Sequence, residues 1–124
     1  MKKTVSAKEL PAALGPYSHA VWAGEFLYCS GQLGTDPATG VMAADVTSQT
    51  ERAMENIKAL LSSQGLELTD VVKSMVFLTD MGSFNAFNEA YGKYFPSAPP
   101  ARSCVGVTAL PAGALVEIEA VAHR

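Results

Sequence analysis

The chain has 124 residues, of which 48% are hydrophobic and 17% are charged, and its net charge at pH 7 is -3. A chain of this length buries about two-thirds of the surface of its unfolded state, so we expect residues 1–124 to form a single domain. Because no cluster of Lys or Arg supplies the positive surface that binds phosphate backbones, nucleic acid is not an expected partner.

The amino-terminal segment MKKTVSAKEL contains two lysines but no apolar stretch after them, and no run in the chain reaches about 18 apolar residues. We therefore expect a cytoplasmic protein with no targeting segment and no membrane partner. The two cysteines, Cys29 and Cys104, both lie in apolar, strand-like runs. A thiol in such a run is more often a packing residue than a ligand, and a disulfide is the less favoured alternative.

The segment HAVWAGEFLYCSG holds two runs of β-forming residues separated by Gly24 and Glu25, a spacing typical of a tight hairpin. A turn, DPATG, follows. From residue 45 to residue 64, hydrophobic side chains recur at helical spacing. Asp45 is the candidate N-cap of this helix, and Gly65 is the residue expected to end it.

Residues 71–79, VVKSMVFLT, are almost continuously apolar, which predicts a central strand covered on both faces. A second helix is expected between Ser83, its candidate N-cap, and Pro96. Its aromatic stripe is interpreted as core: Phe84, Phe87, Tyr91, Tyr94 and Phe95. Two strands near 102–108 and 115–122 complete the chain. The order predicts an α+β fold, in which both helices pack on one face of a single mixed sheet.

Side chains alternate along a strand, so Arg102 and Cys104 lie on one face of the first of these two strands and Val105 on the other. In the last strand, Ile118 belongs to an apolar face and Glu117 to its reverse. We expect Val105 and Ile118 to meet the helices. Arg102 and Cys104 would then lie beside Glu117 on a face that no helix of this chain covers.

Two interpretations of that face remain open. In the first, Arg102 and a glutamate form a solvated cross-strand pair that contributes about 0 to 1 kcal/mol. In the second, the apolar neighbours Cys104, Leu115 and Val121 indicate that another copy of the chain covers the face. Arg102 would then need an anion, and a substrate carboxylate could supply it.

Four segments, GPYSHAV, YCSGQLGTDPATG, PARSCVGV and VEIEAVA, together resemble the RidA (YjgF) family of imine deaminases. The resemblance spans nearly the whole chain, and the segments keep the family's order. It implies a chorismate-mutase-like fold assembled as a homotrimer, with the sheets facing inward and an active site in each of three clefts between subunits. Gly106 departs from the family, in which bulkier polar residues are common at this position.

The resemblance also implies hydrolysis of 2-iminopropanoate and 2-iminobutanoate, the tautomers of enamines such as 2-aminoacrylate, to 2-oxo acids and ammonia. This activity would protect pyridoxal-phosphate enzymes. As catalytic residues it implies Arg102, which matches the carboxylate-binding arginine, and Glu117, which matches the glutamate that holds the water. Other substrate-binding positions are matched by Tyr17, Gly31, Asn88 and Cys104, some reaching the cleft from a neighbouring subunit.

Hydrolysis of an imine needs a positioned water and a proton route rather than a metal, and His19 and His123 lack the spacing of metal ligands. We expect neither metal nor cofactor. Cys104 has no neighbouring histidine in the sequence, so a packing role is favoured over a nucleophilic one. Two alternatives remain: a non-catalytic module that binds a small carboxylate such as 2-oxobutanoate, and a ribonuclease or translation inhibitor, which the acidic charge disfavours.

Overall fold

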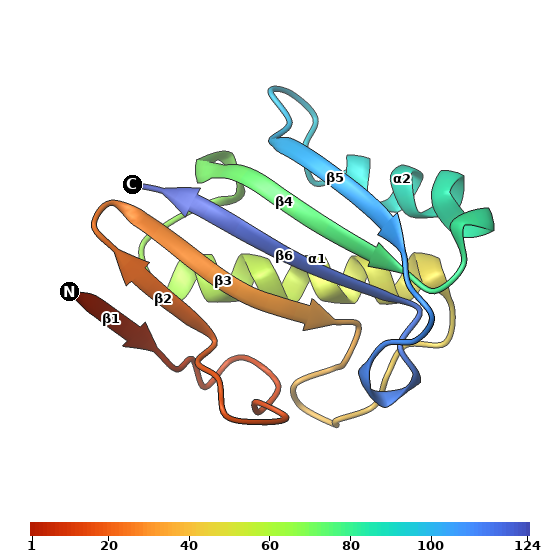
Figure 1. Ribbon diagram of the computed structural model, residues 1–124, viewed down its shortest axis with the longest axis horizontal. Coiled ribbons are helices and arrows are strands. Elements are labelled where there is room, and N and C mark those ends of the chain that lie inside the picture. The colour runs from red at the N-terminus through yellow and green to blue at the C-terminus, as the bar shows by residue number, and fades with distance from the viewer.

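The computed structural model describes all 124 residues as one six-stranded mixed sheet with two helices (Figure 1). The strand order is β1-β2-β3-β6-β4-β5, and only the pair β4 and β5 is parallel. The strands are β1 (Lys2–Val5), β2 (Ala20–Ala23), β3 (Phe26–Leu33), β4 (Val71–Leu78), β5 (Ala101–Gly106) and β6 (Val116–His123), and the helices are α1 (Val46–Ser63) and α2 (Phe84–Gly92). Neither helix has the length and apolar character needed to cross a membrane.

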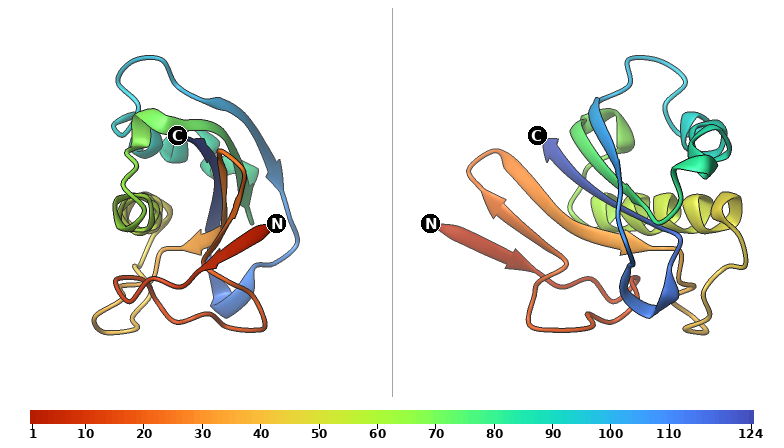
Figure 2. Two further views of the ribbon diagram at one scale, coloured as in Figure 1. Left: turned by 90° about the vertical axis from the view of Figure 1, so that its left-hand side faces the viewer. Right: turned by 45° about the vertical axis from the view of Figure 1, so that its right-hand side comes forward.

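Both helices lie on the same face of the curved sheet, as the two views of Figure 2 show, which confirms the predicted α+β arrangement. The core fills the space between sheet and helices, and its largest fully buried members include Leu27, Met54, Ile57, Leu60, Phe87 and Ile118. No element of the chain covers the opposite face of the sheet, which we call the open face. It carries several exposed apolar side chains, among them Phe26, Tyr28 and Val105.

The first helix begins and ends where the sequence predicts. The Asp45 carboxylate accepts a hydrogen bond from the backbone N–H of Ser48 at 2.8 Å, and the Ser48 hydroxyl accepts one from the backbone N–H of Asp45 at 3.3 Å. This reciprocal pair satisfies two of the free N–H groups at the start of a helix. At the other end Gly65 has a φ of +74°, a conformation that glycine adopts without strain.

The second helix confirms the predicted core stripe but differs at both ends. Ser83 occupies the N-cap position, yet its side chain makes no capping hydrogen bond. Asp80 instead accepts a hydrogen bond from the backbone N–H of Gly82 at 2.8 Å and caps the short 3₁₀ turn that precedes the helix. The helix ends at Gly92, before Pro96, so Tyr94 and Phe95 pack from the turn that follows.

At the amino-terminal edge of the sheet, β2 and β3 form the predicted hairpin. Ala23 pairs with Phe26, which leaves a two-residue turn in which Gly24 has a φ of +61°. The adjoining edge strand β1 was not predicted, because four residues of sequence KKTV carry little alternation of their own. This strand is defined by its pairing with β2.

Strand β4 lies inside the sheet, between β6 and β5, as predicted. The prediction that it is covered on both faces is wrong for this chain. Val76 and Leu78 are fully buried under the helices, whereas Lys73 is exposed and Met75 and Phe77 are only half-buried on the open face.

The prediction that Arg102 and Cys104 lie beside Glu117 is also wrong. Parallel pairing sets Cys104 opposite Val76, and Val76 in turn lies opposite the fully buried Ile118. Arg102 and Cys104 therefore point to the helix-covered face. Val105, expected to meet the helices, is exposed on the open face, which it shares with Glu117. The predicted alternation within each strand was correct, but the register between β4 and β5 decides which of the two alternating sets of β5 side chains faces the helices.

Candidate functional site

A β-bulge in β3 shapes the first part of the site. The pairing of β3 with β6 shifts after Cys29, so that Ser30 and Gly31 both lie opposite Glu119. A bulge of this kind bends the strand and redirects its side chains. Pairing then resumes with Leu33 opposite Glu117, so the irregular backbone lies directly beside the Glu117 carboxylate.

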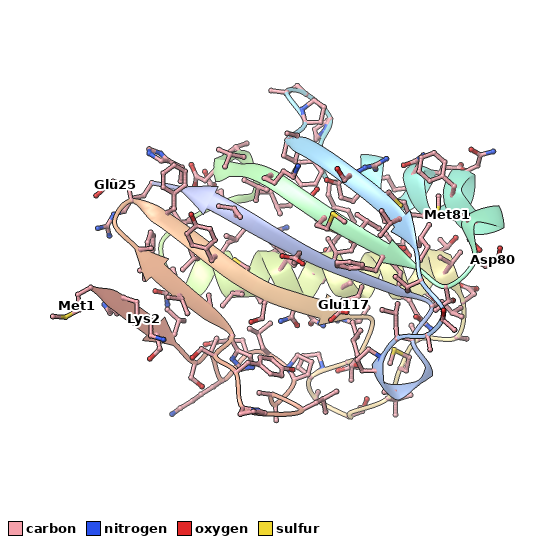
Figure 3. The ribbon with its side chains drawn as sticks, in the orientation of Figure 1. Met1, Lys2, Glu25, Asp80, Met81 and Glu117 are labelled. Atoms are coloured by element: carbon pink, nitrogen blue, oxygen red, sulfur yellow. The ribbon has the colours of Figure 1, made fainter.

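Glu117 projects from β6 on the open face, toward the viewer in Figure 3. It lines a pocket together with Tyr17, Gly31 and Glu119. Burial raises the pKa of the Glu117 carboxyl group above its usual value, and the nearby charge of Glu119 raises it further. A Cβ atom built on Gly31 would lie only 2.5 Å from Oε2 of Glu117, so the position of this carboxylate depends on the absence of a side chain at residue 31.

Tyr17 reaches the same pocket from the loop between β1 and β2. Its phenol oxygen accepts a hydrogen bond from the backbone N–H of Leu14 at 3.1 Å, which anchors the ring across a tight turn. The side chain remains 46% exposed. Three of the residues singled out from the sequence, Tyr17, Gly31 and Glu117, are therefore brought together by one chain.

Arg102 lies elsewhere, against the aromatic stripe of α2. The guanidinium carbon is 5.1 Å from the ring centre of Tyr91, 5.3 Å from that of Phe87 and 5.8 Å from that of Phe84. Cations placed over aromatic faces at such distances are attracted by the rings. The two ion pairs of the structure, Lys93 with Glu51 and Arg124 with Glu25, do not involve Arg102. Arg102 is half-buried as a residue, and its guanidinium has aromatic neighbours but no anionic partner.

Cys104 and Asn88 lie on the same side of the sheet as Arg102. Cys104 packs against the core, and burial raises the pKa of its thiol while the charge of Arg102 acts in the opposite direction. The sulfur is therefore protonated near neutral pH, the unreactive form. Asn88 follows Phe84 by one helical turn on α2 and is half-buried. Cys29 and Cys104 are both free thiols.

The predicted residues thus fall into two groups, which a single chain keeps apart. The Glu117 group comprises Tyr17, Gly31 and Glu117 on the open face, and the Arg102 group comprises Asn88, Arg102 and Cys104 on the helix-covered side. Sequence reasoning missed the contact of Arg102 with the α2 rings because it interpreted them only as core. The helical spacing of those aromatics was visible, but not their proximity to β5. Nowhere in the structure do three His, Cys, Asp or Glu side chains gather in a way that would hold a metal ion.

Fold and site together define a small α+β protein that carries an arginine without an anionic partner and a carboxyl group of raised pKa. A family profile described as Endoribonuclease L-PSP matches residues 7–124. The chain belongs to this family, which includes the RidA (YjgF) proteins, so the resemblance inferred from the sequence is confirmed.

Individual relatives match over nearly their whole length. The chain is 50% identical to Protein DfrA of Myxococcus xanthus, covering 98% of this chain and 95% of the relative. It is 42% identical to the 2-iminobutanoate/2-iminopropanoate deaminase of Salmonella typhimurium, covering 100% and 99%. The crystal structure of RidA from the Antarctic bacterium Psychrobacter superposes with a TM-score of 0.95 at 43% identity, covering 98% of this chain and 99% of the other.

Proposed function

We propose that this chain is a hydrolase that converts 2-imino acids such as 2-iminopropanoate and 2-iminobutanoate to 2-oxo acids and ammonia. One observation carries the proposal: Arg102 is half-buried, and its guanidinium has no anionic partner in its own chain. Removing a charge from water without pairing it costs several kcal/mol, so such a group favours an anionic ligand. The 42% sequence identity to a relative named as an imine deaminase supports the same proposal.

Arginine suits the carboxylate that every 2-imino acid carries. Its planar guanidinium donates two parallel hydrogen bonds to one carboxylate, which fixes the orientation of the substrate as well as its position. The rings of Phe84, Phe87 and Tyr91 hold the guanidinium from the side of α2. A substrate held in this way presents its imine carbon in a fixed direction, the condition under which proximity accelerates a reaction most.

Glu117 supplies the proton transfers in this proposal. An imine carbon is already electrophilic, so its hydrolysis needs an oriented water, a base to take the proton of that water and an acid to assist the departure of ammonia. The raised pKa of Glu117 brings a carboxyl group closer to the pH at which it can serve in both roles.

Because Arg102 and Glu117 lie on different faces of one chain, we propose that the complete site forms between subunits of a homotrimer. The number three comes from the family resemblance. The apolar open face supports the assembly, since Phe26, Tyr28 and Val105 would leave water when a second copy covers it. Light scattering at micromolar concentration should give about three times the 13.0 kDa of the chain, and a clean monomer would contradict a shared site.

The activity is tested by generating 2-aminoacrylate enzymatically and measuring release of ammonia and pyruvate with and without the protein. We expect release well above the rate in buffer alone. Binding of 2-oxobutanoate without any acceleration would instead identify a non-catalytic binding module. RNA cleavage that survives further purification and disappears with Arg102→Ala would favour the ribonuclease after which the family is described.

The shared site has a sharper test in subunit mixing. Arg102→Ala and Glu117→Gln should each be inactive alone, because each removes one half of every site. Refolding them together at equal amounts should restore activity at about a quarter of the clefts, where each neighbour supplies the group that the other lacks. Mixed trimers without any recovery would show that both residues act within one chain.

A further inference from the structure

A second cavity, of about 270 Å³, adjoins the pocket that holds Glu117. It lies where β2 has ended: β2 pairs with β3 only as far as Cys29, so the rest of β3 faces loops instead of a strand. These loops gather at one end of β3, as Figure 1 shows. The cavity and the Glu117 pocket share Leu14, Tyr17, Gly31 and Leu33 in their walls, so the two spaces adjoin at β3, with Gln32 on the helix-covered side and Glu117 on the open face.

The walls of this cavity carry no charged side chain, because neither Lys, Arg, Asp nor Glu is among its lining residues. His19 lines it, but both ring nitrogens are already used. Nδ1 accepts a hydrogen bond from the backbone N–H of Ala7 at 2.9 Å, and Nε2 donates to the carbonyl of Pro11 at 2.9 Å. Neither nitrogen is free to bind a ligand. The cavity therefore favours an uncharged group.

Gln32 is the unusual member of the lining. It is only 6% exposed, yet its amide makes no hydrogen bond within the chain and faces the cavity. The amide is not sealed off from solvent, because the buried side-chain atom that lacks a partner in this structure is Nε of Arg52, so the Gln32 amide opens into the cavity. The Thr35 hydroxyl lines the same cavity, and its partner is the sulfur of Met42 at 3.8 Å, a weak acceptor. Unused donors and an unused acceptor are thus available to a ligand.

We infer that this cavity is the subsite for the substrate side chain, and that Gln32 selects uncharged side chains that end in a hydrogen-bonding group such as an amide. The inference rests on the proposed function, because it requires the imine carbon to lie over Glu117. The space is sufficient: an apolar cavity of about 150 Å³ is known to hold benzene, so a volume of about 270 Å³ admits a side chain of about four to six non-hydrogen atoms.

Two isosteric substrates separate hydrogen bonding from size. The imines formed by an amino-acid oxidase from asparagine and from leucine have side chains of the same shape, one ending in an amide and the other in two methyl groups. Their enzymatic hydrolysis is followed by the decline of imine that semicarbazide can trap. We expect the parent protein to have the higher kcat/KM for the amide-bearing imine.

Gln32→Leu should lower the ratio of the two kcat/KM values, amide over isobutyl, by about tenfold or more, because the amide then meets an apolar wall. Gln64→Leu is the matched control. It makes the same chemical change at a glutamine whose side chain bonds Trp22, away from the cavity, and should leave the ratio unchanged. Thermal unfolding of both variants establishes that they are folded.

Ala12→Phe provides a second variant that does not depend on Gln32. Ala12 is an exposed loop residue on the cavity wall, so a larger side chain there fills the space without disturbing the core. It should lower kcat/KM for both four-atom side chains relative to the alanine-derived imine, whose methyl group does not enter the cavity.

Binding is measured separately from catalysis, so that failure of this inference can be distinguished from failure of the proposed function. Calorimetric titration with the corresponding 2-oxo acids should show tighter binding of the amide-bearing acid to the parent protein, and Gln32→Leu should abolish the preference. Turnover of the alanine-derived imine without any preference between the two longer ones would overturn the subsite and leave the proposed function intact. Absence of all imine turnover would overturn the proposed function, and equal calorimetric affinities would then overturn the subsite as well.

Discussion

The Glu117 region and the Arg102 region accommodate a buried charge in different ways. Glu117 lies in a pocket beside a bulge, and Glu119 nearby makes its negative charge less favourable. Arg102 lies on an edge strand against three aromatic rings, which favour its positive charge. The surroundings of Glu117 destabilise its negative charge, and the surroundings of Arg102 stabilise its positive charge. Neither region contains a group of the opposite charge. Under the proposed function, this difference suits the carboxylate to proton transfer and the cation to binding.

The largest expected effect comes from the proton-transfer side. Glu117→Gln keeps the shape of the side chain and removes its basicity, so kcat should fall by about 10² to 10⁴ while binding of 2-oxobutanoate persists. We expect this variant to be at least as stable as the parent protein. Because burial raises the pKa of Glu117 in the folded state, its ionised form opposes folding at neutral pH, and the neutral amide removes that penalty. Turnover at the parental rate would show that Glu117 has no catalytic role.

On the binding side, Arg102→Ala should lower kcat/KM by about 30- to several-thousand-fold, because it removes a hydrogen-bonded charge partner from a desolvated site. Arg102→Lys should also lower it strongly, since one ammonium cannot hold a carboxylate at two points. Calorimetric titration of 2-oxobutanoate measures the loss directly. Arg124→Ala, which removes a cation packed on Trp22, is the control. Equal affinity in parent and Arg102→Ala would leave Arg102 without a role in binding.

A steric change at Gly31 tests whether the pocket positions Glu117. Gly31→Ala adds a Cβ atom only 2.5 Å from Oε2 of Glu117, so the carboxylate must move, and a displacement of about 1 Å can cost about a hundredfold in rate. We expect kcat to fall by about ten- to a hundredfold, with little change in the unfolding temperature. Gly92→Ala is the matched control, because a Cβ atom there meets nothing within 4 Å. Equal rates for both variants would show that the carboxylate moves aside without consequence.

The charge environment of Glu117 can be measured from the dependence of kcat/KM on pH. If the carboxylate is the active form, kcat/KM falls as the pH drops through its raised pKa, so the acidic limb should lie above the usual value of 4.5. Glu119→Gln removes one of the two causes and should move this limb to lower pH. Glu25→Gln, at the exposed hairpin, should leave it in place. If Glu119→Gln leaves the acidic limb at the same pH, the carboxyl group of Glu117 is excluded as the titrating base.

The same two regions show what the sequence can predict. Asp45, Gly65 and the hairpin at Gly24 were predictable because each depends on a few neighbouring residues. The open face of Glu117 was also predictable from alternation in β6. The face of Arg102 was not, because it depends on the register of β5 against β4, two strands separated by a whole helix. One feature of the sequence indicates the bulge: a glycine inside a strand often marks such a site.

The smallest expected effect concerns the thiol in the Arg102 region. Burial raises the pKa of Cys104, so the sulfur is protonated at neutral pH and acts as a packing group. Cys104→Ser keeps the backbone and nearly the same shape, and kcat/KM should fall by less than about tenfold.

Cys29→Ser is the informative comparison for this variant. Cys29 is more deeply buried, and burial raises its pKa to about 12, so a hydroxyl there should lower the unfolding temperature more than at Cys104. Activity per folded molecule should be nearly unchanged in both variants. A loss of about a thousandfold in Cys104→Ser alone, in a correctly assembled protein, would indicate covalent catalysis by the sulfur. The Arg102 region would then take part in the chemistry, and the division between a binding region and a proton-transfer region would no longer hold.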